Sequence, residues 1–115
     1  MYKISYADVL DDNPSDARER ECEAVGRSIE LMRCAEAAGV NSIESTQAVA
    51  FLTKLWSMLI EDLGRQDNDL PDALRAQLIS IGIWLMKQAE AIRSGGQTSF
   101  ADMITVSEAI RDGLK

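Results

Sequence analysis

The sequence contains no histidine and only two prolines and two cysteines, and aromatic residues make up 5% of its 115 positions. Without histidine the chain lacks the side chain that most often serves as a general base near neutral pH. It also lacks a glycine-rich phosphate-binding loop, and its acidic residues do not follow the order of an EF-hand. These absences argue against an enzyme and imply neither a cofactor nor a metal ion.

The two cysteines, Cys22 and Cys34, lie twelve residues apart in what reads as one continuous helix. A helical rise places them roughly 18 Å apart, which is too far for a disulfide. Neither has a lysine or histidine close by in sequence to activate its thiol. We therefore expect both to be small buried residues of a protein in a reducing compartment.

Acidic residues outnumber basic residues by 19 to 12, which gives a formal net charge of −7. A surface of this sign repels phosphate backbones, so we expect no direct binding to nucleic acid. The longest apolar run, Leu78–Met86, is much shorter than the roughly 20 residues that cross a bilayer, which argues against membrane insertion. Because no apolar signal segment follows the N-terminus, we expect a cytoplasmic protein.

Apolar residues repeat at helical spacing in four segments, and no segment shows the sustained alternation of a strand. Pro14 and Pro71 suit first turns of helices, while Gly39 and Gly64 suit helix ends. Short connections make neighbouring helices antiparallel, and the length suits one domain over residues 1–115. The sequence therefore predicts an all-α fold, a small antiparallel bundle with four main helices at about 15–38, 42–63, 71–94 and 99–112.

Two local patterns concern the starts of helices. Tyr2, Tyr6 and Val9 are spaced to allow a short N-terminal helix or a strap over the bundle. Asn41, with Glu44 three residues later, resembles a capping box and is the candidate N-cap of the second main helix.

The two central helices carry more apolar residues than one core-facing stripe can hold. In the helix at 42–63 the main stripe includes Trp56, which we expect in the core, whereas Phe51 and Met58 fall on the opposite side. In the helix at 71–94 the main stripe runs from Leu74 to Ile92, and a second stripe lies about 120–180° away. Cover by the first and fourth helices, a groove for an amphipathic helix and a homodimer interface are all open explanations. The candidate partner-binding residues are Phe51, Met58, Ile79, Ile83 and Met86.

Several short blocks follow one another along the chain: Met1-Tyr2 with Tyr6-Ala7, Ala17-Arg18-Glu19-Arg20, Arg27-Ser28-Ile29-Glu30-Leu31, Leu55-Trp56, Glu61-Asp62-Leu63, Asn68-Asp69-Leu70-Pro71 with Leu74-Arg75, Ile79-Ser80-Ile81-Gly82-Ile83-Trp84, and Ile110-Arg111-Asp112-Gly113-Leu114. In this order and spacing they resemble the FlaF family of flagellar biosynthesis regulators from alphaproteobacteria. The resemblance covers nearly the whole chain, and none of the blocks is a catalytic signature.

The resemblance implies a non-enzymatic role in flagellin synthesis and export. In that family the protein is linked to flagellin and acts opposite FlbT, a regulator that restrains flagellin translation. Two roles are therefore open. One is a chaperone-like factor that holds a helical segment of flagellin in a groove. The other is a regulator of flagellin expression that acts through a protein partner such as FlbT.

Overall fold

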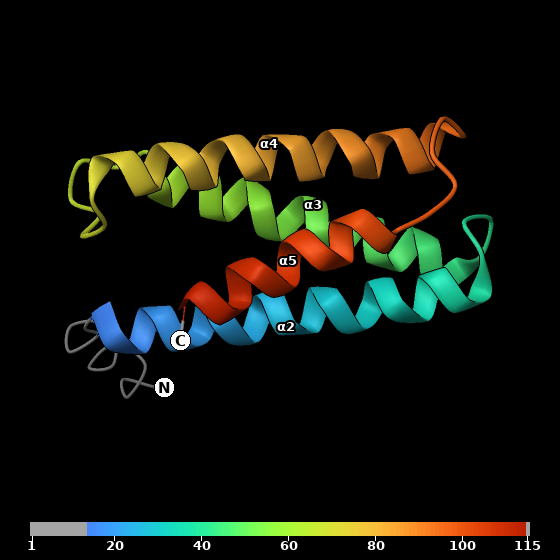
Figure 1. Ribbon diagram of the computed structural model, residues 1–115, viewed down its shortest axis with the longest axis horizontal. Helices are drawn as coiled ribbons and strands as arrows, with labels where there is room; N and C mark the ends of the chain where they lie inside the picture. The colour runs from blue at the N-terminus through green and yellow to red at the C-terminus, as the bar shows by residue number, and fades with distance from the viewer. Residues whose placement is uncertain (1–13, 115) are drawn as a thin grey trace, which may run out of the picture.

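The computed structural model describes residues 14–114, which form four helices (Figure 1). These are α2 (Pro14–Ala38), α3 (Ile43–Leu63), α4 (Asp72–Ser94) and α5 (Ala101–Leu114). Successive helices run in opposite directions, so the predicted all-α antiparallel bundle is confirmed, with boundaries within about two residues of those predicted from sequence. Tyr2, Tyr6 and Val9, whose spacing allows a short helix or a strap over the bundle, lie outside the described residues.

Polar side chains and glycines set the helix ends. The N-cap of α3 is Ser42, whose hydroxyl oxygen accepts a hydrogen bond from the backbone N–H of Ser45 at 3.1 Å. The prediction that Asn41 caps this helix is therefore wrong by one residue. At the end of α4, Gly95 adopts a left-handed conformation with φ of 88°, which glycine reaches without a steric penalty.

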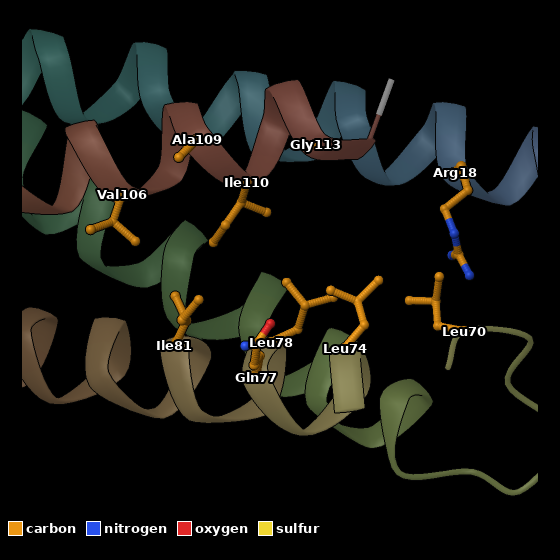
Figure 2. A pocket seen from close by; sticks show the side chains of 10 residues that line it. All are labelled: Arg18, Leu70, Leu74, Gln77, Leu78, Ile81, Val106, Ala109, Ile110 and Gly113. Carbon is orange, nitrogen blue, oxygen red and sulfur yellow. The ribbon is translucent and has the colours of Figure 1, made fainter. Parts of the chain in front are cut away.

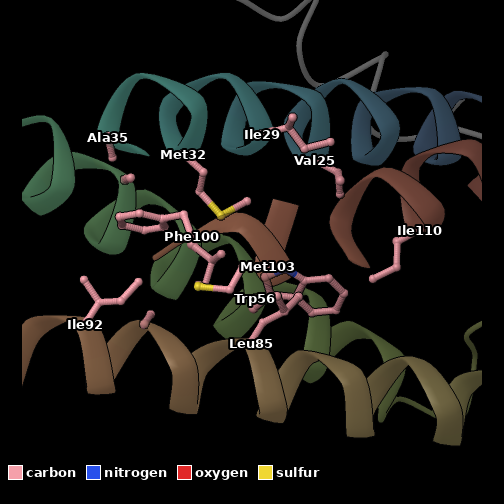
Figure 3. Packing of buried hydrophobic residues seen from close by; sticks show 13 residues of the cluster. Val25, Ile29, Met32, Ala35, Trp56, Leu85, Ile92, Phe100, Met103 and Ile110 are labelled. Carbon is pink, nitrogen blue, oxygen red and sulfur yellow. The ribbon is translucent and has the colours of Figure 1, made fainter. Parts of the chain in front are cut away.

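The core lies between all four helices (Figure 3). Trp56 of α3 is only 2% exposed, as predicted, and is among the largest side chains of the core. Bulky side chains of this kind supply most of the apolar surface that folding removes from water. The other large members come from every helix and its flanks: Val25, Ile29, Met32, Leu52, Leu85, Ile92, Phe100, Met103 and Ile110.

The cysteines differ from expectation. Cys22 is half-buried, and its thiol lies 3.7 Å from the backbone oxygen of Arg111 in α5. Cys34 is exposed, so the prediction that both cysteines are buried is wrong for this residue. Cys34 lies on the side of α2 away from the buried residues Met32 and Ala35, because 100° separates successive helical residues.

The helices do not pack evenly around the core. The main contacts join α2 to α3, α2 to α5, and α3 to α4. Figure 1 shows α5 starting near the end of α4 and then running obliquely onto the first half of α2. The first half of α4 therefore packs on α3, while its side toward α5 remains open.

Candidate binding groove

A groove of about 420 Å³ opens between the first half of α4 and the second half of α5 (Figure 2). Uncharged residues line most of it, including Gln77 from α4 and Ala109 and Gly113 from α5. Pockets of this size and apolar character are typical of binding sites in proteins. The six large apolar side chains of the groove are Leu70, Leu74, Leu78, Ile81, Val106 and Ile110.

Helical periodicity places these side chains on facing surfaces. Leu74, Leu78 and Ile81 follow one another at spacings of four and three residues, so they share one face of α4. Val106 and Ile110 do the same on α5. Leu78 and Ile110 also border a small cavity next to Trp56, so the floor of the groove rests on the core.

The first part of the main stripe of α4 lies in the groove and not in the core. Sequence periodicity assigned this stripe to the core from Leu74 to Ile92. The structure buries its second half, but Leu74 is 40% exposed, and Leu78 and Ile81 are only half-buried. The surplus apolar surface of α4 therefore includes the start of the main stripe, because α5 diverges from α4 there.

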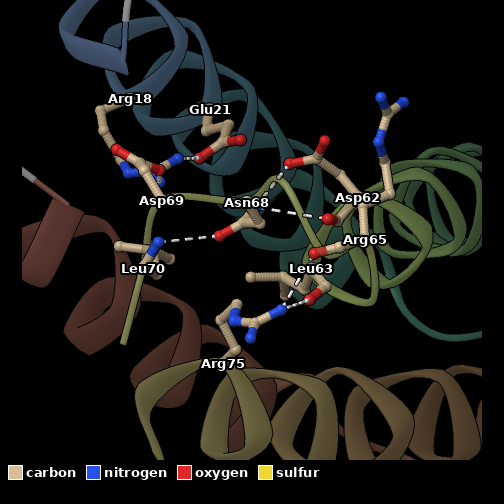
Figure 4. Close-up of polar contacts among 9 residues, drawn as sticks. All are labelled: Arg18, Glu21, Asp62, Leu63, Arg65, Asn68, Asp69, Leu70 and Arg75. Carbon is tan, nitrogen blue, oxygen red and sulfur yellow. Dashed lines mark hydrogen bonds and ion pairs between the residues drawn. The ribbon is translucent and has the colours of Figure 1, made fainter. Parts of the chain in front are cut away.

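An ion-pair cluster bounds one end of the groove (Figure 4). Arg18 of α2 lines this end, and its Nη1 donates to Oε1 of Glu21 at 2.8 Å. Its Nη2 donates to Oδ1 of Asp69 in the loop between α3 and α4. The guanidinium thus ties the start of α2 to that loop across the end of the groove.

The loop between α3 and α4 is held by further hydrogen bonds (Figure 4). Nη1 of Arg75 donates to the backbone oxygens of Leu63 and Arg65, at 3.0 Å each. The side chain of Asn68 accepts from the backbone N–H of Leu70 at 3.0 Å and donates to Asp62. These contacts fix the backbone that presents Leu70 to the groove.

The carboxylates at this end affect one another. Burial raises the pKa of Glu21 above its usual value, and Arg18 only partly opposes this effect. The negative charges of Asp62 and Asp69 push the pKa of Glu21 further upward. Three carboxylates therefore lie close enough to interact, and one guanidinium is hydrogen-bonded to two of them.

Three of the partner-binding residues predicted from sequence, Ile79, Ile83 and Met86, lie on the side of α4 opposite the groove. Ile83 is 42% exposed and lies nine residues, or half a rotation, from Leu74. Ile79 and Met86 are half-buried, and the sulfur of Met86 accepts a weak contact from the hydroxyl of Ser57 in α3 at 3.8 Å. The helix that packs along α4 is α3, and this stripe remains open to solvent at Ile83.

The other two predicted residues lie elsewhere. Phe51 faces a shallow depression between α2 and α3 that Arg27 and Leu31 also line. Met58 is 62% exposed on the outer side of α3, opposite the buried Trp56. The structure therefore brings Ile79, Ile83 and Met86 onto one helix face but does not place Phe51 with them.

Sequence reasoning missed the groove itself. Its residues carry an ordinary core pattern, and their exposure follows from the angle between α4 and α5. Within residues 14–114, no group of three histidine, cysteine, aspartate or glutamate residues is arranged to hold a metal ion. No helix in that range is long and apolar enough to cross a membrane.

Together these features define a small all-α protein with an open apolar groove that an ion-pair cluster bounds at one end. The family model described as "Flagellar protein FlaF" matches residues 2–114, and the chain therefore belongs to the FlaF family. This confirms the resemblance found in the sequence and connects the protein with the flagellum. No curated protein and no solved structure matched the chain.

Proposed function

We propose that this protein binds flagellin, by holding a helical segment of the unassembled subunit in the groove between α4 and α5, and thereby promotes flagellin synthesis and export. The observation that carries the proposal is an open apolar groove in a member of a flagellar protein family. Helix-in-groove binding is a common mode of peptide recognition, in which apolar side chains of an amphipathic helix fill a groove.

The dimensions of the groove suit such a helix. Leu74, Leu78 and Ile81 cover about two turns of α4, or roughly 10 Å of helix. Two turns of an amphipathic helix present three to four apolar side chains on one face. A segment that folds on binding loses part of the interaction energy to ordering, so we expect reversible binding of the kind that a chaperone needs for release.

The test is a calorimetric titration of monomeric flagellin into the purified full-length protein and two variants. Leu74→Glu places a charge inside the groove, and Ile83→Glu places the same charge on the opposite face of α4. The two positions are a matched pair because their side chains are 40% and 42% exposed. We expect wild-type binding with a Kd on the order of micromolar or tighter.

We expect Leu74→Glu to weaken flagellin binding by roughly thirtyfold or more, because a charge at a desolvated contact removes both packing and complementarity. Ile83→Glu should bind like the wild type. Circular dichroism spectra of both variants should match the wild type, since neither position is buried. Absence of binding by the wild type contradicts the proposal. Loss of binding only in Ile83→Glu would assign flagellin to the predicted stripe of Ile79, Ile83 and Met86.

A second function has a separate observation in its favour. The exposed stripe at Ile83 lies opposite the groove and is a candidate surface for a regulatory protein partner such as FlbT. In that role the protein would control flagellin expression without binding flagellin. A pull-down with purified FlbT distinguishes the two, because this function requires FlbT binding that Ile83→Glu abolishes and Leu74→Glu leaves intact.

A further inference from the structure

The groove is bounded at one end by charged side chains and at the other by the core. Leu85 of α4 and Met103 of α5 lie just beyond Ile81 and Val106 and are buried in the core. At the opposite end, Arg18 and Leu70 face each other across the groove (Figure 2). A docked helix therefore has an end, or a side chain close to its end, next to the ion-pair cluster.

The charge at that end is negative. Arg18 is the charged residue that lines the groove, and its Nη1 and Nη2 are engaged by Glu21 and Asp69. Asp62 lies within electrostatic reach of both Glu21 and Arg65. Together with Arg18 and Glu21, residues 61–75 carry six carboxylates and three guanidiniums, so negative charge is in excess at this end. Glu21 also borders the small cavity beneath the groove together with Leu70, Leu78 and Ile110. The carboxylates thus lie at the end of the apolar surface, where a docked side chain would meet them.

We propose that the groove selects an amphipathic helix that carries a lysine or arginine next to its apolar face, at the end that docks against Glu21, Asp62 and Asp69. This inference rests on the proposed function and specifies the chemistry of the bound segment. A basic side chain with a long apolar stem suits the position, because the stem continues the apolar contact while the charge reaches the carboxylates. An acidic side chain there would be repelled.

The direct test uses two synthetic helical peptides with the same leucine face. One peptide carries lysine at both ends of that face, and the other carries glutamate at the same positions. Their affinities for the full-length protein are measured by fluorescence anisotropy. We expect the lysine peptide to bind several-fold more tightly, and we expect its advantage to shrink when salt rises from about 50 mM to about 300 mM, since salt screens exposed charges.

Protein variants identify the carboxylates responsible. Glu21→Gln and Asp69→Asn should each weaken the lysine peptide roughly two- to fivefold, the range for one partly exposed charge pair. The matched control is Glu90→Gln, because Glu90 also pairs with an arginine three residues away in its own helix but lies outside the groove. This control should bind like the wild type. Leu74→Glu should weaken both peptides, which places them in the groove.

Equal binding of the two peptides, tighter binding of the glutamate peptide, or failure of both to bind would overturn the inference. The inference would also be overturned if Glu21→Gln and Asp69→Asn bound the lysine peptide as Glu90→Gln does. A wild-type dimer that Leu74→Glu converts to a monomer would assign the groove to a second copy of the chain and would also contradict the inference.

Two outcomes separate the inference from the proposed function. If the lysine peptide binds as expected but flagellin does not, the inference stands and the proposed function fails. If flagellin binds in the groove without any charge preference, only the inference fails.

Discussion

Gly82 of α4 lies directly against the indole ring of Trp56 of α3. A Cβ atom at residue 82 would overlap Cε3 of Trp56 and lie 2.9 Å from its Cζ3 and 3.2 Å from Cδ1 of Ile60. The absence of a side chain at this position therefore lets the two helices approach closely enough to bury the indole. The contact also anchors α4 to α3 just beyond Ile81, where the groove begins.

We expect Gly82→Ala to destabilise the fold by about 1–3 kcal/mol, because overpacking a filled core forces side chains and backbone to shift. The matched control is Gly26→Ala in α2, where the nearest atom to a new Cβ, Cδ of Arg111, is 3.9 Å away. Removing a mid-helix glycine there should stabilise the protein by roughly 0.5–1 kcal/mol. Urea unfolding followed by circular dichroism measures both effects, and a Gly82→Ala variant as stable as Gly26→Ala would contradict the close contact.

The fold could be predicted from local patterns, because helix starts, helix ends and the core stripe depend on residues close in sequence. Trp56 is buried as its position in the stripe of α3 predicted. The groove could not be predicted in this way. Leu74 has the same pattern as the buried Leu85, and only the direction of α5 decides which of them remains exposed.

Contacts between residues that lie far apart in the sequence could not be predicted from local sequence patterns either. Arg18 and Asp69 lie 51 positions apart, and nothing in their local sequence pairs them. Ile79, Ile83 and Met86 share one face of α4, as their helical spacing predicted. Whether that face binds a partner stays a prediction. Phe51 does not belong to this stripe, because it lines the depression between α2 and α3, which is a different surface.

The start of α5 is capped by a residue from α2. Oε1 of Glu36 accepts a hydrogen bond from the backbone N–H of Phe100 at 2.6 Å, and its Oε2 accepts one from the hydroxyl of Ser99 at 2.8 Å. A carboxylate at a helix N-terminus also interacts favourably with the helix dipole. This contact fixes the point from which α5 crosses toward α2 and so helps to set the opening of the groove.

We expect Glu36→Ala to lower the free energy of unfolding by about 1–2 kcal/mol, the range for loss of a helix cap. Amide hydrogen exchange should also become faster in the first turn of α5. The control is Glu30→Ala, also in α2, whose exposed carboxylate lies 3.9 Å from Arg27. An exposed pair of this kind contributes little, so this variant should stay within about 0.5 kcal/mol of the wild type. Equal effects of the two substitutions would show that Glu36 does not act as a cap.

Glu21 and Glu90 form similar ion pairs but have opposite pKa shifts. Each pairs with an arginine three residues away in its own helix. Burial raises the pKa of Glu21, whereas the hydrogen bond from Arg93 lowers the pKa of the exposed Glu90. Ionisation of Glu21 therefore weakens the folded state, and ionisation of Glu90 strengthens it slightly.

The two glutamates should give opposite pH dependences of stability when each is replaced by glutamine. Because the pKa of Glu21 is raised on folding, its contribution to stability is fully present below the unfolded pKa and is lost as pH rises through the folded pKa. Glu21→Gln should then be more stable than the wild type at pH 7, and the difference should vanish near pH 4, close to the ordinary glutamate pKa.

For Glu90 the sign is opposite. Its contribution to the stability of the fold is present above the unfolded pKa and is lost as pH falls, so Glu90→Gln should be slightly less stable than the wild type at pH 7 and equally stable in acid. Thermal unfolding across this pH range checks both signs. A Glu21→Gln variant that is less stable than the wild type at pH 7 would show that the attraction of Arg18 outweighs the burial of the carboxylate.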